Sequence, residues 1–131
     1  MISKEELKSI PRMNEQLEHL KNRLQELNDI ATTVQGVNYD ERVQTSGDAN
    51  SMNTVDMVLD QRLRIEKLQD KIRNVQKEAL KIFRLIDDPV SATIMEMRYL
   101  DMKEWDDISS ELNYSKRHVL RLHGEVLNEF F

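Results

Sequence analysis

A cluster of hydrogen-bonding side chains follows Ser115 near the C-terminus of this 131-residue chain, and it consists of Lys116, Arg117, His118, Arg121 and His123. Arginine can donate two parallel hydrogen bonds to guanine or hold a phosphate, and lysine supplies a mobile positive charge. A helix that starts at this point also offers free backbone amides to a phosphate. These residue types favour contact with nucleic acid, with a solvated basic face as the alternative.

A helix, a three-residue turn and a second helix are expected to position this cluster. Apolar residues spaced by three and four predict the first helix over residues 104–112, with a buried face formed by Trp105, Ile108 and Leu112. Asn113 tolerates the left-handed backbone conformation that a tight turn requires. Ser115 can cap the second helix with its hydroxyl, so that helix is expected to begin near Lys116.

The second helix distributes the cluster over its surface. Its inward stripe is expected to contain Val119, Leu122, Val126 and Leu127. The other side then carries Lys116, Arg117, His118 and Arg121, with His123 on or near that side. In DNA-binding helix-turn-helix domains, the N-terminal part of the second helix enters the major groove of double-stranded DNA. We therefore predict a DNA-binding set of Ser115, Lys116, Arg117, His118, Arg121 and His123, in which the two histidines are first interpreted as surface or packing residues.

A third helix is expected just upstream. Asp88 can cap it, and Pro89 suits the first helical position because its missing N–H is not needed there. Its apolar side is expected to contain Val90, Ile94, Met97, Tyr99 and Leu100. Residues 88–131 thus form a predicted helix-turn-helix domain of about 40 residues, which is near the lower limit for independent stability and needs support from the rest of the chain.

These C-terminal residues resemble region 4 of sigma-70-type RNA polymerase factors. The matching elements are Arg98-Tyr99-Leu100, Asp106-Asp107-Ile108, and Ser115 with Val119. The chain is also similar, over nearly its whole length, to small phage and prophage proteins with sigma-like C-termini, through IPR at 10–12, ERVQTSG at 41–47 and YSKRHVLRLHGE at 114–125. The resemblance implies a regulator of late transcription that binds DNA.

The chain departs from the sigma pattern at several positions. Met102 stands where a glycine often occurs, Glu104 replaces a serine or threonine cap, and Asn113 replaces the glycine of the turn. None of these residues forbids the fold, but they weaken any transfer of promoter preference. No segment resembles sigma region 2, which argues against a complete promoter-melting factor.

Two long heptad-like seams precede the C-terminal domain and predict two long helices. The first seam comprises Ile10, Met13, Leu17, Leu20, Leu24, Leu27, Ala31 and Val34. The second comprises Val58, Ile65, Leu68, Ile72, Val75, Ala79, Ile82 and Ile86, with Gln61 as its polar position. At the start, Ser3 and Glu6 are expected to form a capping box, and Pro11 is expected to end or kink a short entry turn.

The expected architecture is all-α, with an antiparallel helical hairpin or coiled coil over residues 1–87 and the helix-turn-helix domain after it. Residues 36–54 lack a helical stripe and are predicted to form a loop between the two long helices. The seams can pair within one chain or between two chains. Leu59 and Leu63 widen the second apolar face, which favours a homodimer.

Composition limits the possible functions. The chain contains no cysteine and no apolar run of membrane-spanning length, so we expect a cytoplasmic protein without disulfides, metal, cofactor or membrane contact. No phosphate-binding loop or acid–base constellation is present, so we do not expect an enzyme. The net charge is −5, and residues 88–131 hold nine acidic against five basic side chains. DNA binding is therefore expected to need dimerisation or RNA polymerase.

Three function classes remain open from the sequence. The first is a phage-type transcription regulator, and the second is a DNA-packaging subunit similar to a small terminase. The third is a protein-binding adaptor whose helix-turn-helix does not contact DNA. A ring of eight or more chains would favour packaging, a dimer would favour regulation, and selection of one DNA sequence would exclude the adaptor.

Overall fold

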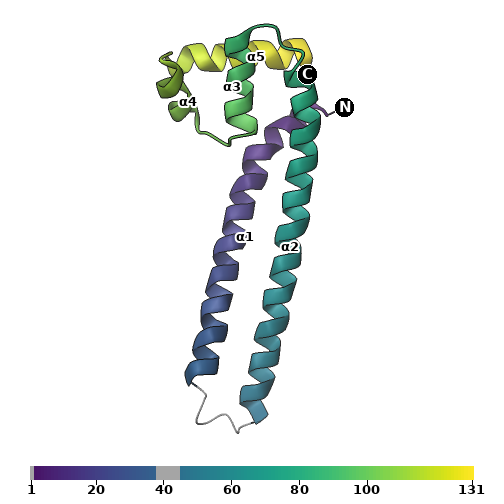
Figure 1. Ribbon diagram of the computed structural model, residues 1–131, viewed down its shortest axis with the longest axis vertical. Helices are drawn as coiled ribbons and strands as arrows, with labels where there is room; N and C mark the ends of the chain where they lie inside the picture. The colour runs from purple at the N-terminus through teal and green to yellow at the C-terminus, as the bar shows by residue number, and fades with distance from the viewer. Residues whose placement is uncertain (1, 38–44) are drawn as a thin grey trace. The chain divides into compact units, whose positions relative to one another are not determined.

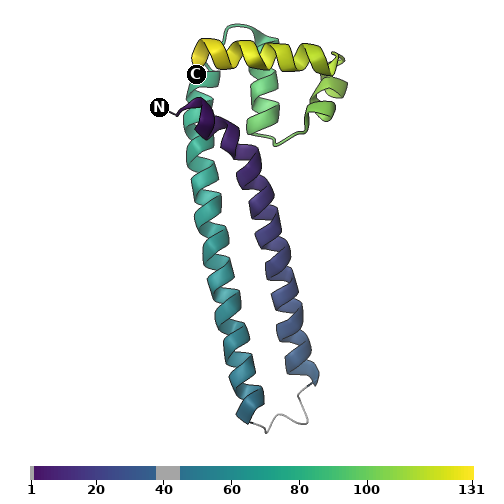
Figure 2. The ribbon, with the colours of Figure 1, turned by 180° about the vertical axis from the view of Figure 1, so that it is seen from behind.

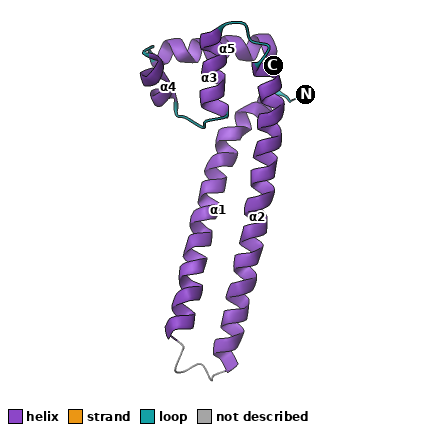
Figure 3. Ribbon diagram, in the orientation of Figure 1, coloured by secondary structure: helices purple, strands orange, loops and turns teal. Residues whose placement is uncertain are grey.

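The computed structural model describes the backbone of residues 2–37 and 45–131, and the side chains of residues 2–30 and 54–131. Within those residues the chain forms helices and no strand (Figures 1 and 3). The helices are α1 (Lys4–Val37), α2 (Thr45–Phe83), α3 (Pro89–Tyr99), α4 (Trp105–Leu112) and α5 (Lys116–Phe130). The predicted all-α fold, with two long helices followed by three short ones, is confirmed.

The start of α1 is held by the predicted capping box. The Ser3 amide donates to Glu6 Oε2 and the Glu6 amide donates to Ser3 Oγ, both at 3.1 Å. Pro11 was expected to end or kink a short entry turn, and the expected end is wrong, because α1 continues through that residue. Proline removes one backbone hydrogen bond. The capped first turn and the complete burial of Leu7 and Ile10 offset this loss.

The predicted loop over residues 36–54 is too long. α1 extends to Val37 and α2 begins at Thr45, so at least residues 45–54 of the expected loop are helical. Residues 38–44 lie outside the described part of the chain. Helix propagation explains the difference, since adding a residue to an existing helix forms a hydrogen bond without repeating the unfavourable nucleation step.

The contacts divide the chain into two compact units, and the division differs from the predicted one at residue 87. One unit, here called the hairpin unit, is residues 15–70; the other, here called the C-terminal unit, is residues 1–14 with 71–131. The long helices run without a break from one unit into the other. The apolar seam of α2 continues across this boundary without interruption, so periodicity could not predict the position at which its packing partner changes.

In the hairpin unit, α1 and α2 lie side by side and antiparallel (Figures 1 and 2). Leu17 and Ile65 of the predicted seam are buried, and the remaining predicted seam residues of this unit with described side chains are half-buried, namely Leu20, Leu24, Leu27, Val58 and Leu68. The polar seam residue Gln61 is also buried, and its Nε2 donates to the Leu20 carbonyl at 3.1 Å. That hydrogen bond joins the two helices within one chain.

In the C-terminal unit, α2 extends the core of the three short helices. Ile94, Ile108 and Val119, one from each short helix, form a fully buried cluster. The last turns of α2 contribute the buried side chains of Ile72, Ala79, Ile82 and Phe83, and Val75 is half-buried. The Phe83 ring lies 6.3 Å from the Tyr99 ring, and Gln76 Nε2 donates to the Tyr99 carbonyl at 2.9 Å. α2 therefore supplies the support that a 40-residue domain needs.

Candidate nucleic-acid interface

A left-handed residue ends α4 and starts the turn toward α5. Asn113 has φ 59° and ψ 36°, and the amide of Tyr114 donates to the Ser109 carbonyl at 3.1 Å. This hydrogen bond satisfies one of the carbonyls left unpaired at the end of a helix. Asparagine is among the few residues other than glycine that adopt this conformation readily, so the predicted role of Asn113 is confirmed.

Ser115 caps α5 in the predicted way. Its backbone is extended, with φ −68° and ψ 151°, and its Oγ accepts a hydrogen bond from the His118 amide at 3.1 Å. α5 consequently begins at Lys116. The cap leaves other amides of the first helical turn without an intrahelical acceptor, and these can face an anion. At the start of α3, Asp88 plays the corresponding part, with Oδ2 accepting from the Ser91 amide and hydroxyl.

Three of the predicted DNA-binding cations are exposed on the first half of α5. They are Lys116, Arg117 and Arg121, and Ser115 is exposed beside them. The opposite face of the helix carries the buried Val119, Val126 and Leu127. The apolar stripe thus orients the basic side chains toward solvent.

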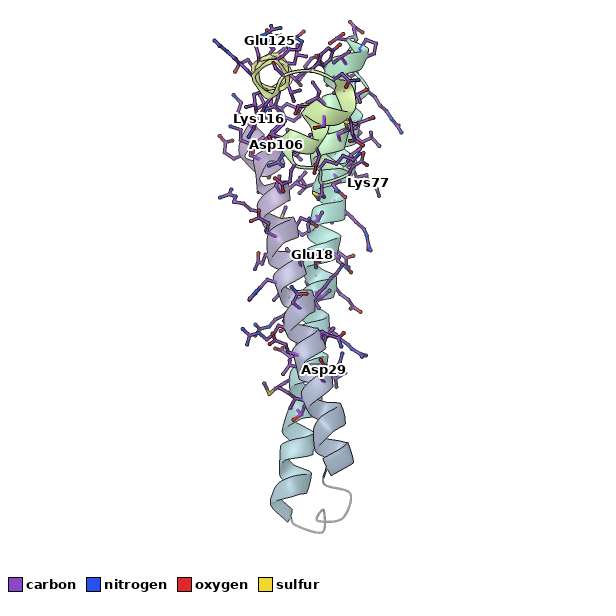
Figure 4. All side chains as sticks on the ribbon, turned by 90° about the vertical axis from the view of Figure 1, so that its left-hand side faces the viewer. Glu18, Asp29, Lys77, Asp106, Lys116 and Glu125 are labelled. Carbon is purple, nitrogen blue, oxygen red and sulfur yellow. The ribbon has the colours of Figure 1, made fainter. Side chains whose placement is uncertain are left out.

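Two of these cations are paired with carboxylates. Lys116 Nζ lies 3.3 Å from Asp106 Oδ1 of α4, and Figure 4 shows the two side chains at neighbouring positions. Arg121 Nη1 lies 2.7 Å from Glu125 Oε1, one turn further along α5. Arg117 has no ion pair with any residue of the described ranges. Exposed pairs of this kind are weak, so a phosphate can compete for Lys116 and Arg121, and Arg117 needs no exchange of partner.

His118 is positioned by its neighbours. Arg121 Nη2 lies 3.0 Å from His118 Nδ1, and the Tyr114 ring meets the imidazole edge-on at 4.9 Å. Because arginine only donates, Nδ1 of His118 accepts this hydrogen bond. His118 is half-buried and helps to orient Arg121.

Two exposed side chains beside the basic residues were not predicted from the sequence. Leu120 is 40 % exposed and Tyr114 is 39 % exposed. Leu120 follows Lys116 by one helical turn and lies off the inward stripe. This spacing could have predicted from the sequence that Leu120 is exposed. An exposed leucine among arginines can contact the methyl group of thymine, as other apolar side chains do in the major groove.

The predicted DNA-binding set is wrong in including His123, because this residue is buried in the core. It is only 9 % exposed, and its Nε2 lies 2.6 Å from the Tyr99 hydroxyl. The Trp105 ring packs edge-on against the imidazole at 4.6 Å. His123 follows the buried Val119 by four residues, and this helical spacing places it on the core side.

Burial shifts both members of this pair toward their neutral forms. Burial, with smaller contributions from the charges of Lys8 and Arg98, lowers the pKa of His123 to about 4. Burial raises the pKa of Tyr99 to about 12. The pair is therefore uncharged at pH 7 and serves packing between α3, α4 and α5.

Arg98 fixes the connection between α3 and α4. Its guanidinium carbon lies 4.7 Å from the centre of the Trp105 ring, and its Nη1 donates to the Lys103 carbonyl at 3.0 Å. Lys103 Nζ in turn binds both carboxylate oxygens of Glu111, at 2.7 and 2.6 Å. These contacts tie the connector to α4, which carries the turn and hence sets the direction of α5.

The described residues contain no group of three or more histidine or acidic side chains that could hold a metal ion. None of the described helices is long and apolar enough to cross a membrane. No protein family, curated protein or solved structure matches the chain. The candidate interface is therefore defined only by its geometry and by the chemistry of its side chains.

Proposed function

We propose that the protein is a sequence-specific regulator of transcription, of phage or prophage type and sigma-like, which places the start of α5 in the major groove of double-stranded DNA. The observation that carries the proposal is the turn and cap at Asn113 and Ser115, which start α5 so that Lys116, Arg117 and Arg121 project from its first half. A helix is the element that fits the major groove, and its N-terminal residues are those that reach base edges.

The exposed residues of α5 have two kinds of role in this proposal, contact with bases and contact with phosphates. Arg117, which forms no ion pair within the described ranges, donates two hydrogen bonds to a guanine. Lys116 and Arg121 exchange their carboxylate partners for phosphates. Leu120 packs on a thymine methyl, and the first amides of α5 bind a phosphate.

The acidic chain sets the conditions for binding. With a net charge of −5, only the start of α5 attracts phosphate strongly, so one chain alone binds DNA weakly. Two linked reading helices in a homodimer, or a contact with RNA polymerase, raise the effective concentration of the second interaction. We therefore include a homodimer and a polymerase partner in the proposal.

A protein-binding adaptor is the second candidate. The observation that favours it is the exposure of Tyr114 and Leu120 beside two cations that carboxylates already partly neutralise. Such a surface resembles the mixed aromatic and arginine composition of protein interfaces. It differs from the first candidate in one decisive respect, because an adaptor does not select a DNA sequence.

Selection from randomised duplex DNA at moderate salt tests the proposal. We expect one enriched motif, and we expect Arg117→Ala to weaken binding by about 1–3 kcal/mol and to relax the preference at one base. Asp106→Asn frees Lys116 and should tighten binding. Lys81→Ala, which removes an exposed cation from α2, is the matched control and should leave the motif unchanged.

The outcomes separate the candidates. A motif that survives both Arg117→Ala and Arg121→Ala would assign reading to another element. An absence of enrichment, with and without RNA polymerase, would reject the regulator and favour the adaptor. Enrichment only with polymerase would define a polymerase-dependent factor.

A further inference from the structure

A groove lies between the turn that precedes α3 and the second half of α5. It encloses about 290 Å³. Its apolar lining comes from Ile86, Leu122, Val126 and Phe130, of which Val126 is buried and the others are half-buried. None of these residues belongs to the candidate DNA-binding set.

Acidic side chains surround this apolar floor. Asp87, Glu125 and Glu129 are exposed at its rim, and Glu125, labelled in Figure 4, projects from α5. Asp87 and Glu129 form no ion pair with any residue in the described part of the chain. Asp88 also borders the groove, but its carboxylate is engaged in capping α3 through Ser91. Two carboxylates without an ion pair, those of Asp87 and Glu129, therefore remain to meet a ligand, and the third, that of Glu125, is shared with Arg121.

The size of the groove and its two kinds of surface indicate the ligand. Pockets for cofactors and drug-sized molecules range from about 300 to 1,000 Å³, so this groove suits a single side chain. An apolar floor with an acidic rim matches a side chain that has a hydrocarbon stem and a cationic tip. Arginine fits better than lysine, because its planar guanidinium can donate to several carboxylates in a fixed fork.

We propose that this groove binds an arginine side chain of a partner protein. The stem of the arginine lies on Leu122 and Val126, and its guanidinium donates to Glu129, Asp87 and Glu125. Charge complementarity selects the partner, because nucleic acid and acidic proteins are repelled by the same rim. The groove therefore provides a protein-binding surface that is chemically distinct from the basic start of α5.

The two surfaces share one residue. Glu125 lies at the groove rim and also pairs with Arg121 at 2.7 Å. An arginine in the groove competes with Arg121 for that carboxylate. Under the function proposed above, occupancy of the groove would release Arg121 to bind phosphate, whereas the groove itself does not depend on that function.

Nuclear magnetic resonance of the full-length, ¹⁵N-labelled chain tests the groove directly. The probes are the acetyl-methylamide derivatives of arginine, lysine and citrulline, the last being the uncharged isostere of arginine. We expect saturable shifts of the Ser91, Val126 and Glu129 amides with the arginine compound, weaker shifts with lysine and none with citrulline. The double variant Asp87→Asn/Glu129→Gln should weaken arginine binding at least about fivefold, corresponding to about 1 kcal/mol.

The control variant is Asp107→Asn, which removes an exposed carboxylate outside the groove and should bind the probe as the unchanged chain does. Equal amide shifts with citrulline would show that the groove does not require a cationic ligand, and they would overturn the proposal. Retained arginine affinity in the double variant, or shifts centred elsewhere, would overturn the site. Because no nucleic acid is present, none of these results depends on DNA binding.

Discussion

The burial of His123 beside Tyr99 links the stability of the C-terminal unit to pH. The imidazole has a pKa of about 4 in the folded chain, against about 6.5 when exposed. Between these values the unfolded chain binds more protons, so the free energy of unfolding falls as pH decreases from about 6.5 to about 4. Above pH 6.5 this contribution is complete. Urea unfolding at pH 7.5, 6 and 5 should show a loss of the order of 1–3 kcal/mol over that window.

His123→Phe provides the test of this assignment, because it keeps an aromatic ring in the core and removes the titrating group. We expect its unfolding free energy to be nearly constant between pH 7.5 and 5. His19→Gln, on the exposed surface of α1, should keep the pH dependence of the unchanged chain. A steep dependence that persists in His123→Phe would show that another group is responsible.

At the residue scale, the roles that could be predicted from the sequence are those that depend only on the local backbone. Asn113 and Ser115 act within one turn of the chain, so residue type and position were sufficient. The burial of His123 depends on Tyr99 and Trp105, which approach from two other helices. The ion pair between Lys116 and Asp106 likewise depends on how α4 meets α5, which helical spacing does not specify.

Among the structural elements, the connector between α3 and α4 contains a left-handed residue that is not glycine. Met102 has φ 59°, a conformation that costs a side-chain-bearing residue about 1–2 kcal/mol. We expect Met102→Gly to be about 1 kcal/mol more stable than Met102→Ala, since both remove the half-buried methionine side chain and only glycine adopts this φ without strain. Urea unfolding at pH 7.5 measures the difference.

A glycine substitution in a regular helix should change the free energy of unfolding in the opposite direction. Ala92 lies within α3, where glycine is less favourable than alanine by about 1 kcal/mol. Ala92→Gly should therefore destabilise the chain. Equal stability of Met102→Gly and Met102→Ala would show that the connector relaxes away from the left-handed conformation.

The extent of the elements was only partly predictable. Periodic apolar residues predicted all five helices, and the caps at Asp88 and Ser115 placed the starts of α3 and α5 correctly. The capping box at Ser3 was predicted for a short entry turn, and it caps α1 itself. The early start of α2 at Thr45 was missed because a helix can extend through residues that carry no apolar stripe. The continuation of α1 through Pro11 was missed because burial on neighbouring turns outweighs one absent hydrogen bond.

For the whole molecule, the outer surface of the hairpin unit supports the proposed homodimer. Val55, Leu59 and Leu63 follow one another at intervals of four on α2, and Leu59 and Leu63 are 53 % and 56 % exposed. A two-helix hairpin has little core of its own, and pairing two hairpins would bury this stripe in a four-helix arrangement. We expect sedimentation equilibrium to give twice the mass of one chain, and the double variant Leu59→Glu/Leu63→Glu to give the mass of one.

Leu85→Glu is the matched control for that variant, since Leu85 is 63 % exposed but belongs to the C-terminal unit. It should leave the dimer intact. Under the proposed function, a dimer would also affect DNA binding, because two linked reading helices would raise the affinity of this acidic chain for DNA. Leu59→Glu/Leu63→Glu should therefore weaken binding to a symmetric site by at least tenfold while α5 stays unchanged, and should leave binding to a single half-site unaffected. A monomeric unchanged chain that still selects a symmetric motif would contradict this link between assembly and recognition.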